Sequence, residues 1–552
     1  MPDHESGSPG FHDDDDQKLE SLGYVPSFKR EFSNLATISF AFSIMGLCSS
    51  VATTFNTPLL LGGPSSVTWC WILGATMCFT LGNSLPFLAL AFPTCGGLYT
   101  ASARLVPKRH RPIVGWVVGW LNILGQVAGL SSTEFGLSTM IWAAVVVAKD
   151  GNYEVTSGKV VGLFVGLLLF HGILNCLATR HLANFTKGFV FINLGTSVII
   201  VIVLLATTER HEMHSASYVF GSEGVVNQTN GWNSGLAFLF GLLSVQWTDY
   251  DATAHISEEV KRAAYAAPAA IFIAVIGTGL LGWLLNIVLI LCSGPLCVKP
   301  TVPRISLMIM ALRMGKTGAL FLWTFVCLTA FFVCQTALQA CSRTVYAFSR
   351  DHGTSFTSSR FPDRGYFGYV SKLTHTPLRA IWLSTIFSIL PGLLDFASPV
   401  AASAIFSLTA MALDISYIIP IALRRIYQHH PEVQFKPGPF YMGDGLLGWA
   451  VNINCIVWTL FVSVIFSLPT YLPVTKDTMN YASVITGGVV LLAMIWYFID
   501  GRRHYHGPHA NFQDGVTPTI IGIGEGDGEK ASISSKDEGK EEGSLLSLNN
   551  HD

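Results

Sequence analysis

The sequence predicts an all-α, polytopic membrane protein of about twelve transmembrane helices, and three observations support this fold class. Half of the 552 residues are hydrophobic and only 12% are charged, whereas soluble domains carry about 25% charged residues. Apolar runs long enough to cross a bilayer, which takes about 20 residues, recur along most of the chain. Polar tails flank these runs at both ends.

Residues 1–30 and 505–552 are rich in charged, Gly and Ser residues that cannot bury a core, so we expect two disordered tails around a transporter domain at 31–504. The acidic first tail lacks the basic start of a cleavable signal peptide, so the first span is expected to act as the membrane signal. The expected spans are residues 35–62, 66–92, 113–147, 159–178, 186–207, 234–257, 268–292, 318–348, 378–396, 401–423, 446–468 and 481–500.

The distribution of Lys and Arg predicts the orientation of the spans. Most basic residues flank the spans on the side of the tails, as in "LVPKRHR" at 105–111 and "LRRI" at 423–426. By the positive-inside rule both termini are cytoplasmic. The sequon "NQT" then places Asn227 on the outer face, where N-glycosylation occurs. We expect the plasma membrane as the location, with the vacuolar membrane as the alternative.

Several classes of function are disfavoured. A net charge of −2 argues against a nucleic-acid partner. The eleven cysteines are scattered, mostly inside apolar runs, and behave as small buried hydrophobes; Cys292 and Cys297 flank an outer loop and form the one candidate disulfide. No nucleophile–base pair or metal motif is visible, so neither an enzyme nor a cofactor is expected.

Two spans are interrupted near bilayer depth. The first holds small and hydroxylated residues in "FAFSIMGLCSSVATTFNTP", and the sixth holds ionisable ones in "SVQWTDYDATAHISEEV". Freed backbone groups persist at that depth only around a wet cavity or a ligand. Paired interruptions five spans apart predict an inverted-repeat transporter with its site at the midplane, where half-helix N-termini favour anions and C-termini favour cations.

The candidate site residues follow from these breaks. The binding segments are Ser43, Ile44, Met45, Gly46, Leu47, Cys48 and Ser49 in the first span and Gln246, Trp247, Thr248 and Asp249 in the sixth. The candidate coupling or gating residues are Glu134, Asp249, Asp251, His255 and Glu258, because ionisable groups within a membrane are costly and usually functional.

Purely structural roles remain as alternatives for these residues. Asp251, His255 and Glu258 share a helix face at i, i+4 and i+7; a metal site there lacks matching ligands elsewhere in the chain. The pair Glu258–Glu259 could instead be a solvated helix end. Glu134 could be a buried, partnered carboxylate, and His171 a satisfied core histidine.

The motifs "FSIMGLCSS", "TTFNTPLLLGGP", "AFPTCGGLYTAS", "WLNILGQVAG" and "TDYDATAHISEEV" resemble the amino acid–polyamine–organocation superfamily, within it the fungal GABA and choline permeases. The resemblance covers roughly residues 20–505. It implies two inverted five-helix repeats plus two extra helices, and proton-coupled uptake of a small ammonium-bearing solute across the bilayer. In that case Trp247 could offer a cation–π face to the ammonium group.

The chain departs from the family pattern at three places. Pro86 and Phe87 stand where the signature has Ala-Glu, and "WTDYD" stands where relatives read "WTMTDYD". Asn193 lies where many proton-coupled relatives carry a lysine in span 5. The expected function is a proton symporter that imports a small amino acid such as GABA by alternating access. The alternatives are a choline carrier of the same fold and a non-transporting nutrient sensor.

Overall fold

The computed structural model describes residues 10–89, 91–245, 249, 251–294, 304–354, 366–396, 399–433, 435, 441–475 and 478–508. Apart from one isolated bridge between Phe32 and Val260, these residues form helices, turns and irregular segments, so the all-α class is confirmed. The helices are α1 (Gly10–Ser21), α2 (Asn34–Met45), α3 (Leu47–Thr54), α4 (Asn56–Leu61), α5 (Pro64–Ala89), α6 (Gly97–Arg104), α7 (Arg111–Ala148), α8 (Ser157–Asn175), α9 (Thr179–Thr186), α10 (Phe189–Thr207), α11 (Ala216–Phe220), α12 (Ser234–Leu239), the 3₁₀ helix η4 (Phe240–Ser244), α13 (Ala252–His255), α14 (Ala263–Leu291), α15 (Ile305–Arg350), α16 (Leu378–Gly392), α17 (Pro399–Ile426), α18 (Leu446–Ser467) and α19 (Ala482–Ile499).

The helices match the expected spans. Among the described residues, ten helical segments are long and apolar enough to cross a membrane. The other two expected spans correspond to α5, which has 26 residues, and to the interrupted run α12–η4–α13. The largest difference is at α15, which begins at Ile305 rather than at residue 318 and contains a non-helical residue, Gly315 (φ 76°). The stretch before Gly315 is too short to span a bilayer, which is why length alone did not predict it.

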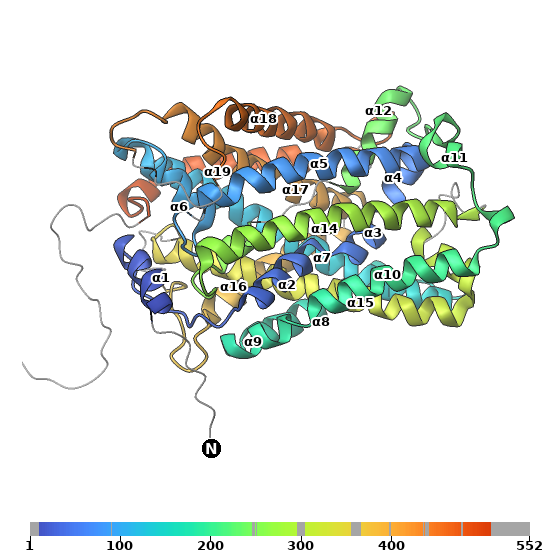
Figure 1. Cartoon of the computed structure of the whole chain (residues 1–552), viewed down its shortest axis with the longest axis horizontal. Coiled ribbons are helices and arrows are strands. Elements are labelled where there is room, and N and C mark those ends of the chain that lie inside the picture. The colour runs from blue at the N-terminus through green and yellow to red at the C-terminus, as the bar shows by residue number, and fades with distance from the viewer. Residues whose placement is uncertain are drawn as a thin grey trace, which may run out of the picture. The chain divides into compact units, whose positions relative to one another are not determined.

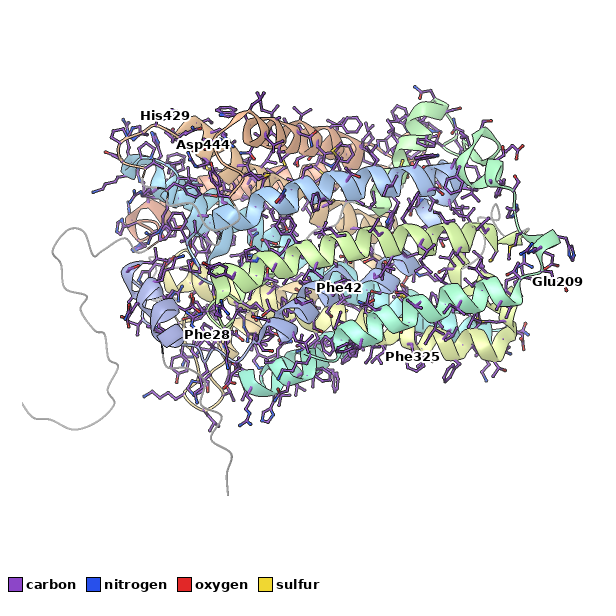
Figure 2. The ribbon with its side chains drawn as sticks, viewed as in Figure 1. Phe28, Phe42, Glu209, Phe325, His429 and Asp444 are labelled. Carbon is purple, nitrogen blue, oxygen red and sulfur yellow. The ribbon has the colours of Figure 1, made fainter. Side chains whose placement is uncertain are left out.

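The long helices lie roughly side by side, so the bundle has two ends, and we name each end by the elements that lie there (Figure 1). At one, the tail-side end, lie α1, α6 and α9; at the other, the loop-side end, lie α11 and α12. Figure 2 shows Phe28, His429 and Asp444 toward the tail-side end, and Glu209 at the loop-side end.

Some glycines allow close contacts between helices inside the bundle, whereas others face open space. A Cβ at Gly282 of α14 would lie 2.3 Å from the Trp71 ring of α5, and a Cβ at Gly119 of α7 would lie 2.3 Å from the Phe348 ring of α15. These glycines allow large aromatic side chains to pack against a helix backbone. By contrast, a Cβ at Gly166 of α8 would meet nothing within 4 Å.

Candidate functional site

The first break lies at Gly46, between α2 and α3. Gly46 adopts φ 55° and ψ 61°, a left-handed conformation that favours glycine, and its N–H donates to the carbonyls of Phe42 and Ser43. A Cβ at Gly46 would lie 2.5 Å from Val333 Cγ2. The Ser50 hydroxyl donates to the Met45 carbonyl at 2.8 Å. The break therefore lies inside the predicted segment from Ser43 to Ser49.

The second break separates η4, which ends at Ser244, from α13, which begins at Ala252. Asp249 lies in this linker with φ 63°, and its N–H donates to the Tyr417 hydroxyl at 2.9 Å. Gln246, Trp247 and Thr248, three of the predicted binding residues, lie outside the described residues, so their role stays a prediction. The same holds for the "WTDYD" departure.

A cavity of about 540 Å³ lies between the two breaks and the loop-side end. Met45, Gly129 and Asp249 line its inner part, and Tyr471 and Asn480, beyond α18, line its outer part. Its volume lies in the range that suits small-molecule sites, about 300–1,000 Å³. The sequence thus predicted both breaks, and the structure joins them through one cavity.

Asp249 brings a carboxylate to this cavity. Its Oδ1 is buried and has no hydrogen-bond partner among the described residues. Its Oδ2 would lie 3.0 Å from a Cβ at Gly129, so the glycine allows the carboxylate to approach the backbone of α7. A buried carboxylate oxygen without a partner favours a cationic ligand, because leaving it unpaired is costly.

Asp251 and His255 form a buried cluster on the tail side of Asp249. His255 Nε2 lies 2.9 Å from Asp251 Oδ2, and its Nδ1 lies 3.0 Å from the Cys95 carbonyl. The Tyr417 hydroxyl donates to Asp251 Oδ1, and the Asn122 amide donates to Oδ2. A carbonyl only accepts, so Nδ1 carries a proton. The two predicted residues are therefore in contact, and the hydrogen bond between Nε2 and Asp251 Oδ2 holds a second proton.

Glu134 and His171 form a second buried acid–base pair, in which Glu134 lies between the cavity-lining residues Thr133 and Phe135 of α7. His171 Nδ1 on α8 lies 2.6 Å from Glu134 Oε1 on α7, and both side chains are fully buried. His171 Nε2 and Glu134 Oε2 have no hydrogen-bond partner in the part of the chain that is described. Sequence reasoning named Glu134 but treated His171 as a core histidine, since nothing in the sequence links two residues on different helices.

The predicted helix face that joins Asp251, His255 and Glu258 is not formed, because α13 ends at His255. Glu258 instead accepts a bidentate pair from Arg350 at 3.0 and 3.1 Å, and accepts the Cys95 N–H at 2.9 Å. Glu259 pairs with Arg343 at 2.6 Å, with both side chains fully buried. The alternative of a solvated helix end for the two glutamates is therefore wrong.

The segment before α2 also makes buried polar contacts at the tail-side end. Arg30 donates to the carbonyls of Ser257 and Val260, both at 3.0 Å. The first tail, residues 1–30, was expected to be disordered but contains the helix α1. Tyr24 and Tyr99 donate to Asp351 Oδ2 at 3.0 and 2.8 Å. Burial, together with the negative charge of Asp351, raises the pKa of Tyr24 well above its ordinary value.

The remaining predictions are placed as follows. Asn227 is exposed at the loop-side end, where its Nδ2 donates to the Trp232 carbonyl. Asn193 is buried, and its Nδ2 lies 3.5 Å from the Phe42 carbonyl beside the first break. Cys297 and residues 509–552 lie outside the described residues. The backbone of α5 continues through positions 86 and 87. No group of three metal-binding side chains occurs in the described ranges.

Comparison with known proteins gives a consistent result. Residues 32–491 match the family model described as "Amino acid permease". The chain is 42% identical over 507 residues to an uncharacterized amino-acid permease of Schizosaccharomyces pombe, with 90% of each chain covered. It is 35% identical to amino-acid permease 2 of Neurospora crassa, with 89% of each chain covered. It is 32% identical to the GABA-specific permease of Saccharomyces cerevisiae, with 92% of this chain and 88% of the relative covered.

Proposed function

The chain belongs to the amino acid permease family and is an integral, multi-pass membrane transporter, and on that premise we propose that it imports a small amino acid such as GABA by proton symport. The observation that carries this proposal is the cavity, which extends from the loop-side end to Asp249 between two broken helices. The tail-side end is meanwhile held shut by buried ion pairs. An open cavity on one side and a closed gate on the other is one half of an alternating-access cycle.

Asp249 is the proposed partner of the solute's ammonium group. Its free Oδ1 can accept a charge-assisted hydrogen bond, which contributes roughly 1.5–3 kcal/mol. The backbone around Gly46 and residues Gln246 to Asp249 would complete the site. The name of the yeast relative supports GABA as the first solute to test.

Protons are the proposed coupling ion, carried by one or both of the buried acid–base pairs. Asp251–His255 lies two residues beyond the proposed ammonium site, so a proton there and a solute at Asp249 would influence each other through a short path. Glu134 lies between the cavity-lining residues Thr133 and Phe135 of α7, and the Glu134–His171 pair also holds unpartnered polar atoms. Histidine suits this role, because each ring nitrogen can either carry a proton or accept a hydrogen bond.

The proposed orientation places the tail-side end in the cytoplasm and the cavity mouth on the outside of the plasma membrane. The concentration of Lys and Arg beside the tail-side ends supports this. Asn227 would then be available for glycosylation, and glycosidase treatment of the membrane protein would test both proposals through a shift in its mobility.

The test is uptake of labelled GABA and labelled choline at pH 5 and pH 7.5, in yeast that lacks its own carriers. We expect GABA uptake that rises at low pH, collapses with a protonophore and is lost in Asp249→Asn. Asp150→Asn, an exposed aspartate paired with Lys316 at the loop-side end, is the matched control. Choline uptake alone would overturn the proposed solute, and absence of both fluxes from protein in the membrane would point to a different solute, to the Pro86-Phe87 and "WTDYD" departures, or to a sensor.

A further inference from the structure

Among the described residues, one arginine lines the outer part of the cavity. Arg304 precedes α15 at the loop-side end and is half-buried. Its Nη1 donates to the Thr53 carbonyl of α3 at 2.8 Å, and its Nη2 donates to the Thr139 hydroxyl of α7. These two contacts fix the guanidinium group between α3 and α7, on the wall of the cavity.

The guanidinium group has donors left for a ligand. Arginine carries five N–H donors, of which two make these contacts. The other three have no hydrogen-bond partner among the described residues, and none of the described carboxylates forms an ion pair with Arg304. Two other loop-side cations form ion pairs: Arg313 contacts Glu212, and Lys316 contacts Asp150.

Arg304 and Asp249 lie at different depths of the same cavity. Asp249 is next to Gly129 of α7, and Arg304 contacts Thr139 of the same helix. Ten residues of helix correspond to about 15 Å at 1.5 Å per residue. A four-carbon amino acid is much shorter than that, so a solute whose ammonium group reaches Asp249 cannot also touch Arg304.

We propose that Arg304 forms an outer subsite that receives the carboxylate of an incoming amino acid before its ammonium group reaches Asp249. This inference rests on the proposed function and deepens it, because it names the solute class as zwitterionic. The fork of N–H groups matches the two oxygens of a carboxylate. A positive charge in a narrow vestibule also raises the local concentration of carboxylates and repels solutes that carry only a cationic group.

The experiment compares labelled GABA uptake by the full chain with its inhibition by n-butylamine, which has the ammonium group but no carboxylate. We expect R304Q to raise the half-saturation concentration of GABA about tenfold, with the maximal rate unchanged within twofold. Inhibition by n-butylamine should stay the same or become stronger. R304K, which keeps the charge but not the fork, should lie between wild type and R304Q. The control is R313Q, which removes a loop-side arginine that does not line the cavity and should leave GABA half-saturation unchanged.

Two results would overturn the subsite. One is an unchanged half-saturation concentration in R304Q; the other is an equal loss of GABA and n-butylamine recognition, which would indicate that Arg304 only holds α3 against α7. Failure of the proposed function is separate from both, because it would appear as absence of GABA uptake in the wild type.

Discussion

Replacing Gly129 by alanine should separate stability from transport. The new Cβ would lie 3.0 Å from Asp249 Oδ2 and 3.2 Å from Thr409 Cγ2, closer than ordinary van der Waals contact. Asp249 lies in a non-helical linker and can yield by a few tenths of an ångström, whereas α7 is regular. Alanine also favours a helix over glycine by up to about 1 kcal/mol. The fold should therefore be maintained while the carboxylate moves.

The displaced carboxylate should bind the solute less well. If about half of a charge-assisted hydrogen bond of roughly 1.5–3 kcal/mol is lost, the half-saturation concentration should rise by a factor of about three to twelve, since ~1.4 kcal/mol is a factor of ten. The assay is GABA uptake over a range of concentrations, combined with thermal unfolding of the purified protein. The control is Gly166→Ala, whose Cβ meets nothing within 4 Å. Normal half-saturation in Gly129→Ala, or an equal change in Gly166→Ala, would refute the role of Gly129 in positioning Asp249.

Three further predictions concern the other polar groups. Glu134→Gln should reduce proton-driven accumulation of GABA at least tenfold while exchange of internal for external GABA persists; loss of both, with protein still in the membrane, would show that Glu134 acts on folding or binding instead. Arg343→Met leaves the buried Glu259 charge unpaired, which costs about 3–5 kcal/mol of stability, so the midpoint of thermal unfolding should fall. Adding Glu259→Gln to this variant removes the unpaired charge and should recover much of the lost thermal stability. Tyr24→Phe removes a hydrogen bond to Asp351 and should cost roughly 1 kcal/mol near pH 7. Because the folded-state pKa of Tyr24 is raised, its contribution to the free energy of unfolding is present below about pH 10 and is lost as the pH rises through the folded-state pKa. The difference in the free energy of unfolding between the wild type and Tyr24→Phe should therefore narrow above pH 10.

The broken helices could be predicted because their cause is local. Gly46 lies among small and hydroxylated residues, and only glycine readily adopts the left-handed conformation found there. Asp249 and Asp251 interrupt an apolar run at a depth where ionisable groups are costly, so a functional role could be hypothesised for them from composition alone.

The partners of these groups could not be predicted, because they depend on how distant helices pack. His171 contacts Glu134 from 37 positions away, and Tyr417 contacts Asp251 from 166 positions away. Neither spacing has a periodicity that a sequence pattern could reveal. The sequence likewise does not distinguish Arg304 from other basic residues of the loops, since its place on the cavity wall follows from contacts with α3 and α7.

The position of Asp249 in the chain explains how binding could open the gate. Glu258 and Glu259, the proposed gate carboxylates, pair with Arg350 and Arg343 and follow Asp249 by nine and ten residues in the same short segment. Asp251 ties this segment to α17 through Tyr417 and to α7 through Asn122. A solute can shift a conformational equilibrium only by its difference in affinity between the two states. A solute that pulls Asp249 toward the cavity would strain the segment that leads to Glu258 and Glu259. Protonation of Asp251 would weaken its contacts with Tyr417 and Asn122, which oppose this movement. Solute and proton would then act on one mechanical element, so neither alone should open the tail-side end as readily as both together.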